Sequence, residues 1–195
     1  MVPRRNQVFE LRGINHMALV CKDMARTVDF YTNVLGMPLI KTLELPNGMG
    51  QHFFFDCGGG ASIAFFWFAN APKAAPGIAS AAALPGQAGD ISTAHGSMNH
   101  LAFDVPADKI EEYHKRLVER GVEVTQILNH DDSESTVSKD INDTTFVRSL
   151  YFYDPDGIVL EFAAWTREFN TTSDIKHTPA RADGKREAAK PTEYA

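Results

Sequence analysis

The sequence predicts an α+β fold of two βαβββ modules that pair into an open, incomplete β-barrel. Three observations support this prediction: strand-like and helix-like segments follow an order that occurs twice, an Asn-His pair opens each repeat, and a tight-turn hairpin closes the second. Each repeat has too few strands to enclose a core alone, so the two repeats must pack together. The 195 residues therefore suit one compact domain of two halves.

The first repeat begins with a strand. Residues 14–20 alternate in character, so His16 lies on one face with every second neighbour. Asp23 is the expected N-cap of a helix that reaches Leu35 and stops at Gly36. Aromatic and β-branched runs between turn residues predict the remaining strands. They are expected at residues 39–45, 52–56 and 61–68.

The second repeat follows the same order. Residues 98–103 repeat the first strand, so His100 occupies the position of His16, and Gly157 that of Gly60. The turn before the last strand contains Pro and Gly, which preset the backbone of a tight turn. A helix is expected at residues 107–120, a strand at 122–128, and hairpin strands at 146–154 and 158–165.

This pattern divides the chain into four parts. The first module covers residues 11–68, the second covers 98–165, and a linker rich in Ala, Gly and Pro covers 69–97. A linker of this length is a functional lid, a packing arm or a disordered span, and the sequence favours none of the three. From residue 166 to 195 the chain is polar, and its end is expected to be a flexible tail or an arm on a neighbouring subunit. Residues 129–144 form a second polar loop.

Composition excludes several classes of protein. The net charge is −6, with no Lys/Arg run outside the tail, so neither nucleic acid nor an anionic membrane is an expected partner. No apolar run is long enough to span a bilayer, and the N-terminus lacks the apolar region of a secretory leader. Cys21 and Cys57 are expected to be reduced and buried. We therefore expect a soluble cytoplasmic protein.

One carboxylate stands out. Glu161 interrupts an apolar strand, and a charge that enters a core needs a partner or a metal. If the two sheets face one another across a pseudo-two-fold axis, His16, His100 and Glu161 converge from three strands on one point, while Ala64 occupies the matching position of the first repeat. Each residue alone suits a core or surface role, but together they favour a metal site inside the open barrel. Two imidazoles and one carboxylate are typical of non-haem Fe(II) chemistry, although Zn, Mn or Ni could also bind.

These features resemble the vicinal oxygen chelate superfamily, which includes glyoxalase I, fosfomycin- and bleomycin-resistance proteins and type I extradiol dioxygenases. The resemblance rests on the duplicated pattern, the two Asn-His pairs and the run Tyr-Asp-Pro-Asp-Gly before Glu161, and it covers residues 11–165. The run from Leu150 to Glu161 is similar to the end of the extradiol signature. That similarity implies that Glu161 is an iron ligand and that Tyr151 hydrogen-bonds a substrate oxygen.

The sequence departs from the extradiol pattern at two places. That pattern has a histidine near Asn142 and another near Ala61, and neither is present here. Ring cleavage needs an acid or base, so another residue must substitute or the reaction must differ. His52, His130 and His95 are the candidates for this role. Asn142 can donate a hydrogen bond but cannot act as a base.

The expected substrate is small and aromatic. Ala61 and Ala64 leave space beside the aromatic runs 53–55 and 65–67, which suits a flat apolar molecule better than a phosphonate. Arg148 is the one cation of the second hairpin, which disfavours a fosfomycin-type enzyme.

The leading hypothesis is therefore an Fe(II) extradiol-type dioxygenase that acts with O2 on a catecholic compound. Two alternatives stay open: a redox-neutral isomerase or lyase of the same superfamily, and a binding protein that sequesters an aromatic compound. A homo-oligomer is expected, and the modules could pair within one chain or between two.

Overall fold

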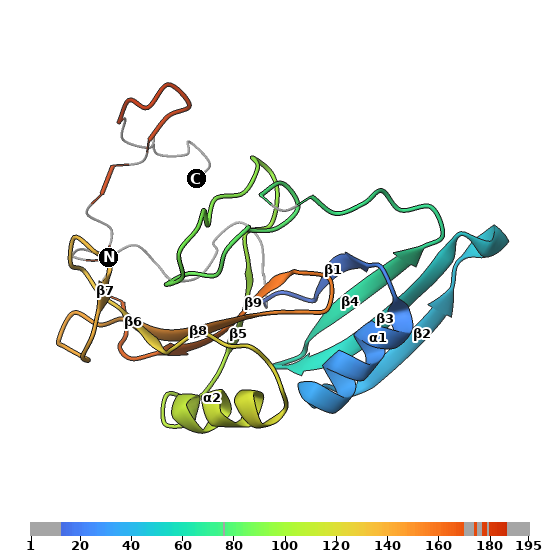
Figure 1. Cartoon of the computed structure of the whole chain (residues 1–195), viewed down its shortest axis with the longest axis horizontal. Coiled ribbons are helices and arrows are strands. Elements are labelled where there is room, and N and C mark those ends of the chain that lie inside the picture. The colour runs from blue at the N-terminus through green and yellow to red at the C-terminus, as the bar shows by residue number, and fades with distance from the viewer. Residues whose placement is uncertain (1–12, 76, 170–173, 175–176, 179, 187–195) are drawn as a thin grey trace, which may run out of the picture. The chain divides into compact units, whose positions relative to one another are not determined.

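The structure, a computed structural model, describes residues 13–75, 77–169, 174, 177–178 and 180–186 (Figure 1). The described residues 13–167 form one compact unit, and the described residues from Glu168 onward belong to another. Within that second unit, Ala180 and Arg186 form an isolated antiparallel bridge. Most of the predicted tail, and the start of the first module at residue 11, lie outside the described residues. No helix among the described residues is long and apolar enough to cross a membrane.

The first half is a four-stranded sheet with helical turns on one side, as predicted (Figure 1). Its strand order is β1-β4-β3-β2, in which β1 and β4 are parallel and the other pairs are antiparallel. The strands are β1 (His16–Cys21), β2 (Leu39–Glu44), β3 (Gly50–Gly58) and β4 (Ala61–Phe68), and the helical segments are α1 (Met24–Asp29), the π-helix η1 (Phe30–Val34) and the 3-10 helix η2 (Pro46–Gly48).

The predicted helix of this half is present, but it changes type. Asp23 is its N-cap, and the Asp23 carboxylate accepts a bond from the Arg26 N–H. From Phe30 the helix continues with the wider π spacing, which the periodicity of the sequence does not reveal. The chain then leaves the helix through Gly36, whose φ of 77° favours glycine.

The second half is a five-stranded sheet of order β5-β9-β8-β6-β7 with one helix. Its elements are β5 (Leu101–Asp104), α2 (Ile110–Glu119), β6 (Leu128–His130), β7 (Val137–Ser138), β8 (Val147–Tyr153) and β9 (Val159–Trp165). The sheets and the few helices confirm an α+β fold without a closed barrel.

One predicted strand of this half is wrong. Residues 122–128 do not form a strand, and β6 begins only at Leu128. Val124 makes an isolated bridge with Phe152, and beside it the Thr125 hydroxyl accepts the bond that the Tyr151 N–H donates. Because the Tyr151 N–H bonds to the Thr125 hydroxyl and not to a backbone carbonyl, the regular pattern of backbone hydrogen bonds between strands is interrupted there. The polar loop after β6, by contrast, contains the short strand β7.

Strand register confirms the internal duplication. In the first sheet Ala64 lies between Ala18 on β1 and Phe54 on β3. In the second sheet Glu161 lies in the same way between Ala102 on β5 and Tyr151 on β8. The two halves therefore share one architecture but carry different side chains at equivalent places.

The main core lies on the helical side of both sheets. Its buried side chains include Tyr31 from η1, Phe55 and Phe65 from the first sheet, and Leu150 and Phe152 from the second. Single strands expose alternate residues to opposite faces, so the residues between these core positions lie on the other face of each sheet.

The turn between β8 and β9 forms hydrogen bonds with the first half of the chain. The Asp156 carboxylate accepts a bond from the Lys22 N–H at 2.9 Å, and the Tyr31 hydroxyl donates to Asp154 at 3.3 Å. Asp154 also accepts from the backbone N–H groups of Asp156 and Ile158, which shapes the turn. Burial raises the pKa of Asp154 to about 6, and the nearby charge of Asp156 adds to this rise.

We expect Asp154→Asn to stabilise the protein at neutral pH but not at pH 4. The native carboxyl keeps its proton up to about pH 6, whereas the unfolded one loses it near pH 4, so wild-type stability falls as pH rises through this window. The loss amounts to ~1.4 kcal/mol per pH unit between the two pKa values. The asparagine oxygen can accept the two backbone bonds, and its nitrogen can donate to the Tyr31 hydroxyl in place of the bond from it, without the charge. Urea denaturation at several pH values measures the difference, and a gap that does not change with pH would contradict the prediction.

The linker has no helix or strand among its described residues, but it is packed. Ala81 and Leu84 are buried in a small cluster with Tyr151 and Val159, separate from the main core. Leu128 and Tyr153 pack against this cluster. Since Tyr151 and Leu128 lie on the face of Glu161, the linker covers the side of the second sheet that faces away from α2.

Candidate metal site

The candidate site lies on the face of the second sheet that is opposite α2. Glu161 projects from β9, directly across from Tyr151 on β8. His100 lies one residue before β5, and its Nε2 is 3.0 Å from Glu161 Oε2. The Glu161 side chain is 7% exposed and that of His100 is 37% exposed, so the carboxylate is buried while the imidazole remains accessible. The structure therefore brings together two of the three predicted ligands.

The tautomer of His100 follows from its neighbour. Nδ1 lies 2.9 Å from Asn99 Oδ1, and because an amide oxygen only accepts, Nδ1 carries the proton. The lone pair of a neutral His100 then points from Nε2 toward a carboxylate oxygen. Two acceptors at this distance repel unless a proton or a cation lies between them. A divalent ion satisfies both groups, so the pair fits a metal.

Without a metal, the contact between His100 and Glu161 shifts the pKa values of both side chains. The hydrogen bond with Glu161 raises the pKa of His100, although burial opposes it. Burial raises the pKa of Glu161, but the hydrogen bonds and charge from His100, together with contacts from Ser149 and Tyr151, hold that pKa below its usual value. The site thus keeps the carboxylate ionised, as a metal ligand must be.

His16 has the same local geometry in the other half. Its Nδ1 lies 2.8 Å from Asn15 Oδ1, so its Nε2 is also left as an acceptor. Among the described residues, however, no third His, Cys, Asp or Glu joins His100 and Glu161 in a group that could hold a metal. The chain by itself does not bring His16 to the pair, and its role as a ligand stays a prediction.

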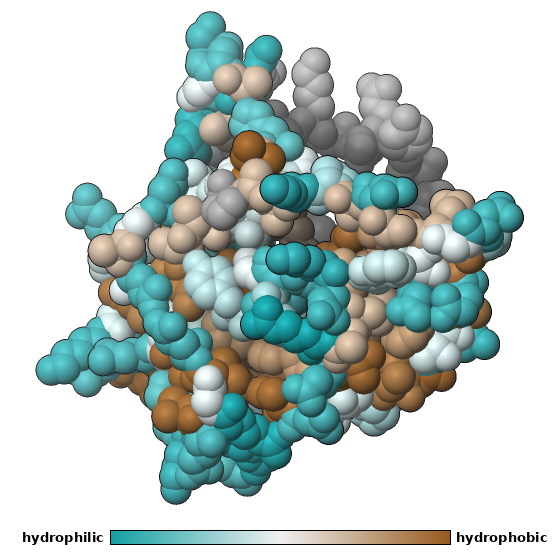
Figure 2. Space-filling model, turned by 45° about the vertical axis from the view of Figure 1, so that its right-hand side comes forward, coloured by the Kyte–Doolittle hydropathy of each residue, from teal (hydrophilic) through white to brown (hydrophobic). Residues whose placement is uncertain are grey.

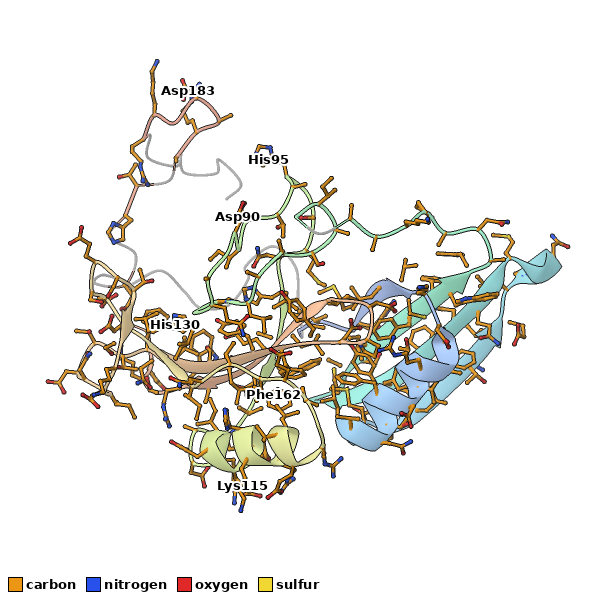
Figure 3. The ribbon with its side chains drawn as sticks, in the orientation of Figure 1. Asp90, His95, Lys115, His130, Phe162 and Asp183 are labelled. Atoms are coloured by element: carbon orange, nitrogen blue, oxygen red, sulfur yellow. The ribbon has the colours of Figure 1, made fainter. Side chains whose placement is uncertain are left out.

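Tyr151 links the pair to His130. The Tyr151 hydroxyl and His130 Nε2 are 3.2 Å apart, and the Tyr151 ring meets the edge of the His100 ring at 5.8 Å between centroids. Burial, and then the charge of Glu161, raises the pKa of Tyr151 well above its usual value, so the hydroxyl keeps its proton. In Figure 3, His130 lies on the side of the sheet that faces away from α2. Phe162 points to the opposite side, toward Tyr113 of α2.

Ser149 was not predicted as a site residue. It lies two residues before Tyr151 on the same strand face, and it is fully buried. No hydrogen bond of regular geometry reaches its hydroxyl among the described residues, but the hydroxyl lies close enough to Glu161 to lower the pKa of that carboxyl. Because a hydroxyl can rotate, it can donate either to Glu161 or to a bound ligand. The alternation Ser149, Tyr151 was the sequence pattern that could have identified it.

The other candidates lie elsewhere. The His52 Nδ1–H donates to the Phe65 carbonyl at 3.2 Å, and its ring stacks on Phe66 in the first sheet. His95 lies in the linker (Figure 3). The structure brings neither residue into the group formed by His100, Glu161, Tyr151 and His130.

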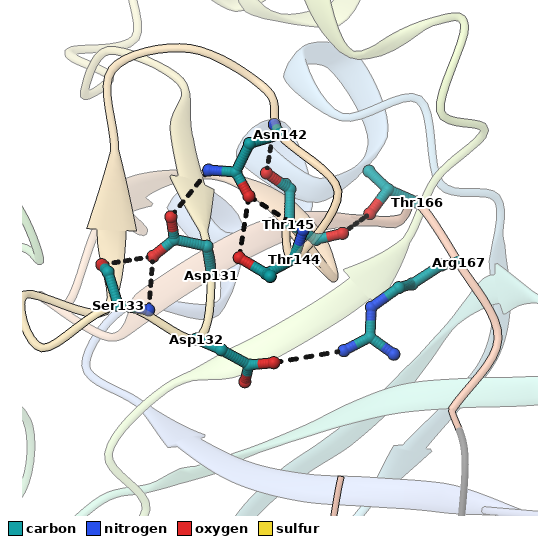
Figure 4. Close-up of polar contacts among 8 residues, drawn as sticks. All are labelled: Asp131, Asp132, Ser133, Asn142, Thr144, Thr145, Thr166 and Arg167. Carbon is teal, nitrogen blue, oxygen red and sulfur yellow. Dashed lines mark hydrogen bonds and ion pairs between the residues drawn. The ribbon is translucent and has the colours of Figure 1, made fainter. Parts of the chain in front are cut away.

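Asn142 organises the polar loop after β6 (Figure 4). Its amide nitrogen donates to Asp131 at 2.9 Å, and its oxygen accepts from the Thr144 backbone and hydroxyl. Bonds from Ser133 and then Asn142 lower the pKa of Asp131 to about 2. These contacts occupy Asn142 in loop structure, and its predicted catalytic role stays a prediction.

The face around His16 is apolar and partly exposed. The His16 and Phe54 rings form a T-shaped contact at 5.5 Å between centroids, as the His100 and Tyr151 rings do. In the next row of this face Val20 and Leu43 are 49% and 41% exposed. Figure 2, which brings the right-hand side of Figure 1 forward, shows hydrophobic residues among polar ones on that side of the molecule.

The Arg148 side chain lies neither on the Glu161 face of the second sheet nor on the His16 face of the first sheet. It alternates with Ser149 along β8 and pairs with Glu111 at 2.7 Å and Asn129 at 3.1 Å. The cation of the second hairpin is therefore engaged on the α2 side.

Comparison with known proteins is consistent with this architecture. A family model described as the Glyoxalase/Bleomycin resistance protein/Dioxygenase superfamily matches residues 13–162. The metallothiol transferase FosB of Shouchella clausii (strain KSM-K16) is 25% identical over 151 residues, 77% of this chain and 79% of that protein. The protein of the same name from Lysinibacillus sphaericus (strain C3-41) is 26% identical over 157 residues, 80% of this chain and 84% of that protein.

Solved structures share the fold at low identity. SMU.1112c has a TM-score of 0.53 and 24% identity over 77% of this chain and 97% of that one. A variant of the fosfomycin resistance protein FosX from Listeria monocytogenes has a TM-score of 0.52 and 21% identity over 80% of this chain and 94% of that one. That structure contains Mn(II) and 1S,2S-dihydroxypropylphosphonic acid.

Proposed function

We propose that this chain, which belongs to the Glyoxalase/Bleomycin resistance protein/Dioxygenase superfamily, is a redox-neutral enzyme that depends on a divalent metal. The observation that carries the proposal is the 3.0 Å approach of His100 Nε2 to Glu161 Oε2, with the other ring nitrogen held by Asn99. The named relatives support an enzyme of the group-transfer kind, because both are called metallothiol transferases. They give no particular support to ring cleavage.

His100, Glu161 and His16 would hold the metal, with His16 supplied by a second copy of the chain. His16 has the same fixed tautomer as His100 but does not reach the pair within one chain. The exposed apolar residues Val20 and Leu43, which lie further along the same face of the first sheet, are suited to burial against a partner. A two-fold dimer would exchange the two histidines equally and form two identical sites.

The chain's own residues define the chemistry around this centre. A bound divalent ion would act as a Lewis acid toward two neighbouring oxygen atoms of a substrate. The Tyr151 hydroxyl, which stays protonated, donates a hydrogen bond to a substrate oxygen beside Glu161. His130 Nε2, 3.2 Å from that hydroxyl, can donate to the hydroxyl oxygen and so hold the hydroxyl toward the substrate. The buried Ser149 hydroxyl offers one further contact.

An Fe(II) ring-cleaving dioxygenase is the second candidate. It is favoured by the position of Tyr151 opposite Glu161 and by the aromatic face around His16. The engagement of Arg148 with Glu111 leaves an anionic substrate such as a phosphonate without that cation, which also suits an uncharged aromatic compound.

Metal analysis and a substrate panel test the proposal. Protein stripped of metal is loaded with Mn(II), Zn(II), Ni(II) or, without air, Fe(II), and its binding is measured by calorimetry. Each form then receives fosfomycin with a small thiol, a hemithioacetal, or a series of catechols with O2 uptake recorded. If the Mn(II) or Zn(II) form turns over a substrate without taking up O2, the result supports a redox-neutral enzyme. O2 uptake by the Fe(II) form alone would replace it with the dioxygenase, and absence of metal binding would overturn both.

A further inference from the structure

The linker segment 77–97 packs on the face of the candidate site, and Leu84 is its largest buried side chain there. Leu84 is 1% exposed and packs in the cluster that contains Tyr151 and Val159. A side chain at Gly86 would press against Leu128, which shows how closely this part of the segment lies on the sheet. By contrast, Ile78 in the same segment is 61% exposed. The segment is therefore held over the Glu161 face mainly near Leu84.

A second attachment of this segment is made by the residue that holds His100. The Asn99 amide nitrogen donates to the Ile91 carbonyl at 2.8 Å and lies 3.4 Å from the Thr93 hydroxyl. The oxygen of the same amide accepts from His100 Nδ1. A planar amide cannot turn one end without moving the other, so a shift of the backbone at Ile91 changes the hydrogen bond of His100.

We propose that residues 77–97 are a lid over the site and that Asn99 is a positioning residue that couples the lid to His100. The inference rests on the proposed function in that it takes His100 as a metal ligand. Partners of a ligating histidine fix its orientation, and their loss typically weakens metal binding by 10- to 100-fold. A closed lid then favours metal binding, and metal binding favours the closed lid by the same factor.

Mn(II) calorimetry on the full chain tests the coupling with four proteins. Asn99→Ala is expected to weaken Mn(II) binding about tenfold, and Leu84→Ala about fivefold although it touches no ligand. The double variant is expected to bind no more weakly than Asn99→Ala, because both changes act through one hydrogen bond. Ile78→Ala, a truncation at an exposed position of the same segment, is the control and should not change binding. Unchanged binding by Leu84→Ala, or effects that multiply in the double variant, would overturn the inference.

A metal-free measurement separates this inference from the proposed function. By NMR, the His100 Nδ1 proton of Leu84→Ala is expected to exchange with water several times faster than in wild type, whereas Ile78→Ala leaves the rate unchanged. If wild type fails to bind Mn(II), the proposed function fails and this rate alone decides the inference. An unchanged rate in Leu84→Ala would overturn the coupling. Unchanged exchange of the core amides shows that the variant is folded.

Discussion

Copies with His16→Ala and copies with Glu161→Ala, unfolded and refolded together in equal amounts, are expected to recover metal binding that neither variant shows alone. In a hybrid dimer one site combines His16 of one copy with the intact His100 and Glu161 of the other. Half of the dimers are hybrids and each has one complete site, so about a quarter of the sites should bind. Mn(II) electron paramagnetic resonance counts the bound metal.

A second mixture controls this experiment. His100→Ala and Glu161→Ala remove two residues that lie 3.0 Å apart in one chain, so no exchange between copies restores a complete set. This mixture should stay without metal. Recovery in neither mixture, when refolded wild type binds normally, would show that His16 is not supplied by a partner.

Tyr151→Phe is expected to lower turnover by about a hundredfold or more while metal affinity changes less than threefold. The substitution removes only the hydroxyl that contacts His130 and faces the Glu161 position, and phenylalanine fills nearly the same volume. Metal binding should persist because the hydroxyl is not among the proposed ligands. Turnover is measured on the substrate that the panel identifies, beside calorimetry of the metal.

Tyr153→Phe is the matched control, since Tyr153 is the next residue on the same face of β8 but pairs with Val159. It should retain near-wild-type turnover. Equal losses in both variants would point to packing of the strand instead of a role in the reaction. Tyr151→Phe with wild-type turnover would remove Tyr151 from the mechanism.

The sequence predicted the duplicated fold because its dominant signals are local and periodic. Strand alternation, the Asp23 cap and the Gly36 stop each depend on a few neighbouring residues, and the structure contains all of them. The strand predicted at residues 122–128 is absent from the structure, although these residues have the composition of a strand. It was interrupted because the Thr125 side chain bonds to Tyr151, a contact between distant residues that no local pattern encodes.

The site was predictable only in part, for a related reason. The sequence predicted that His100 and Glu161 converge because the repeat placed His100 on a first strand and Glu161 was a charge in an apolar strand, and the structure places the two in contact. The repeat also paired His16 with them, but a repeat does not reveal whether its halves meet within one chain or between two. Asn99 was not identified because its role depends on a hydrogen bond to His100. Ser149 was not identified because its role depends on burial, although it alternates with Tyr151 along the strand.

The unequal halves also determine a stoichiometry. A duplicated fold could carry one ligand set in each half, yet Ala64 and Phe54 stand where the second half has Glu161 and Tyr151. The first half therefore offers a histidine without the carboxylate that would complete a second centre. A metal titration should therefore saturate at one equivalent per chain, because only the second half carries a carboxylate at this position.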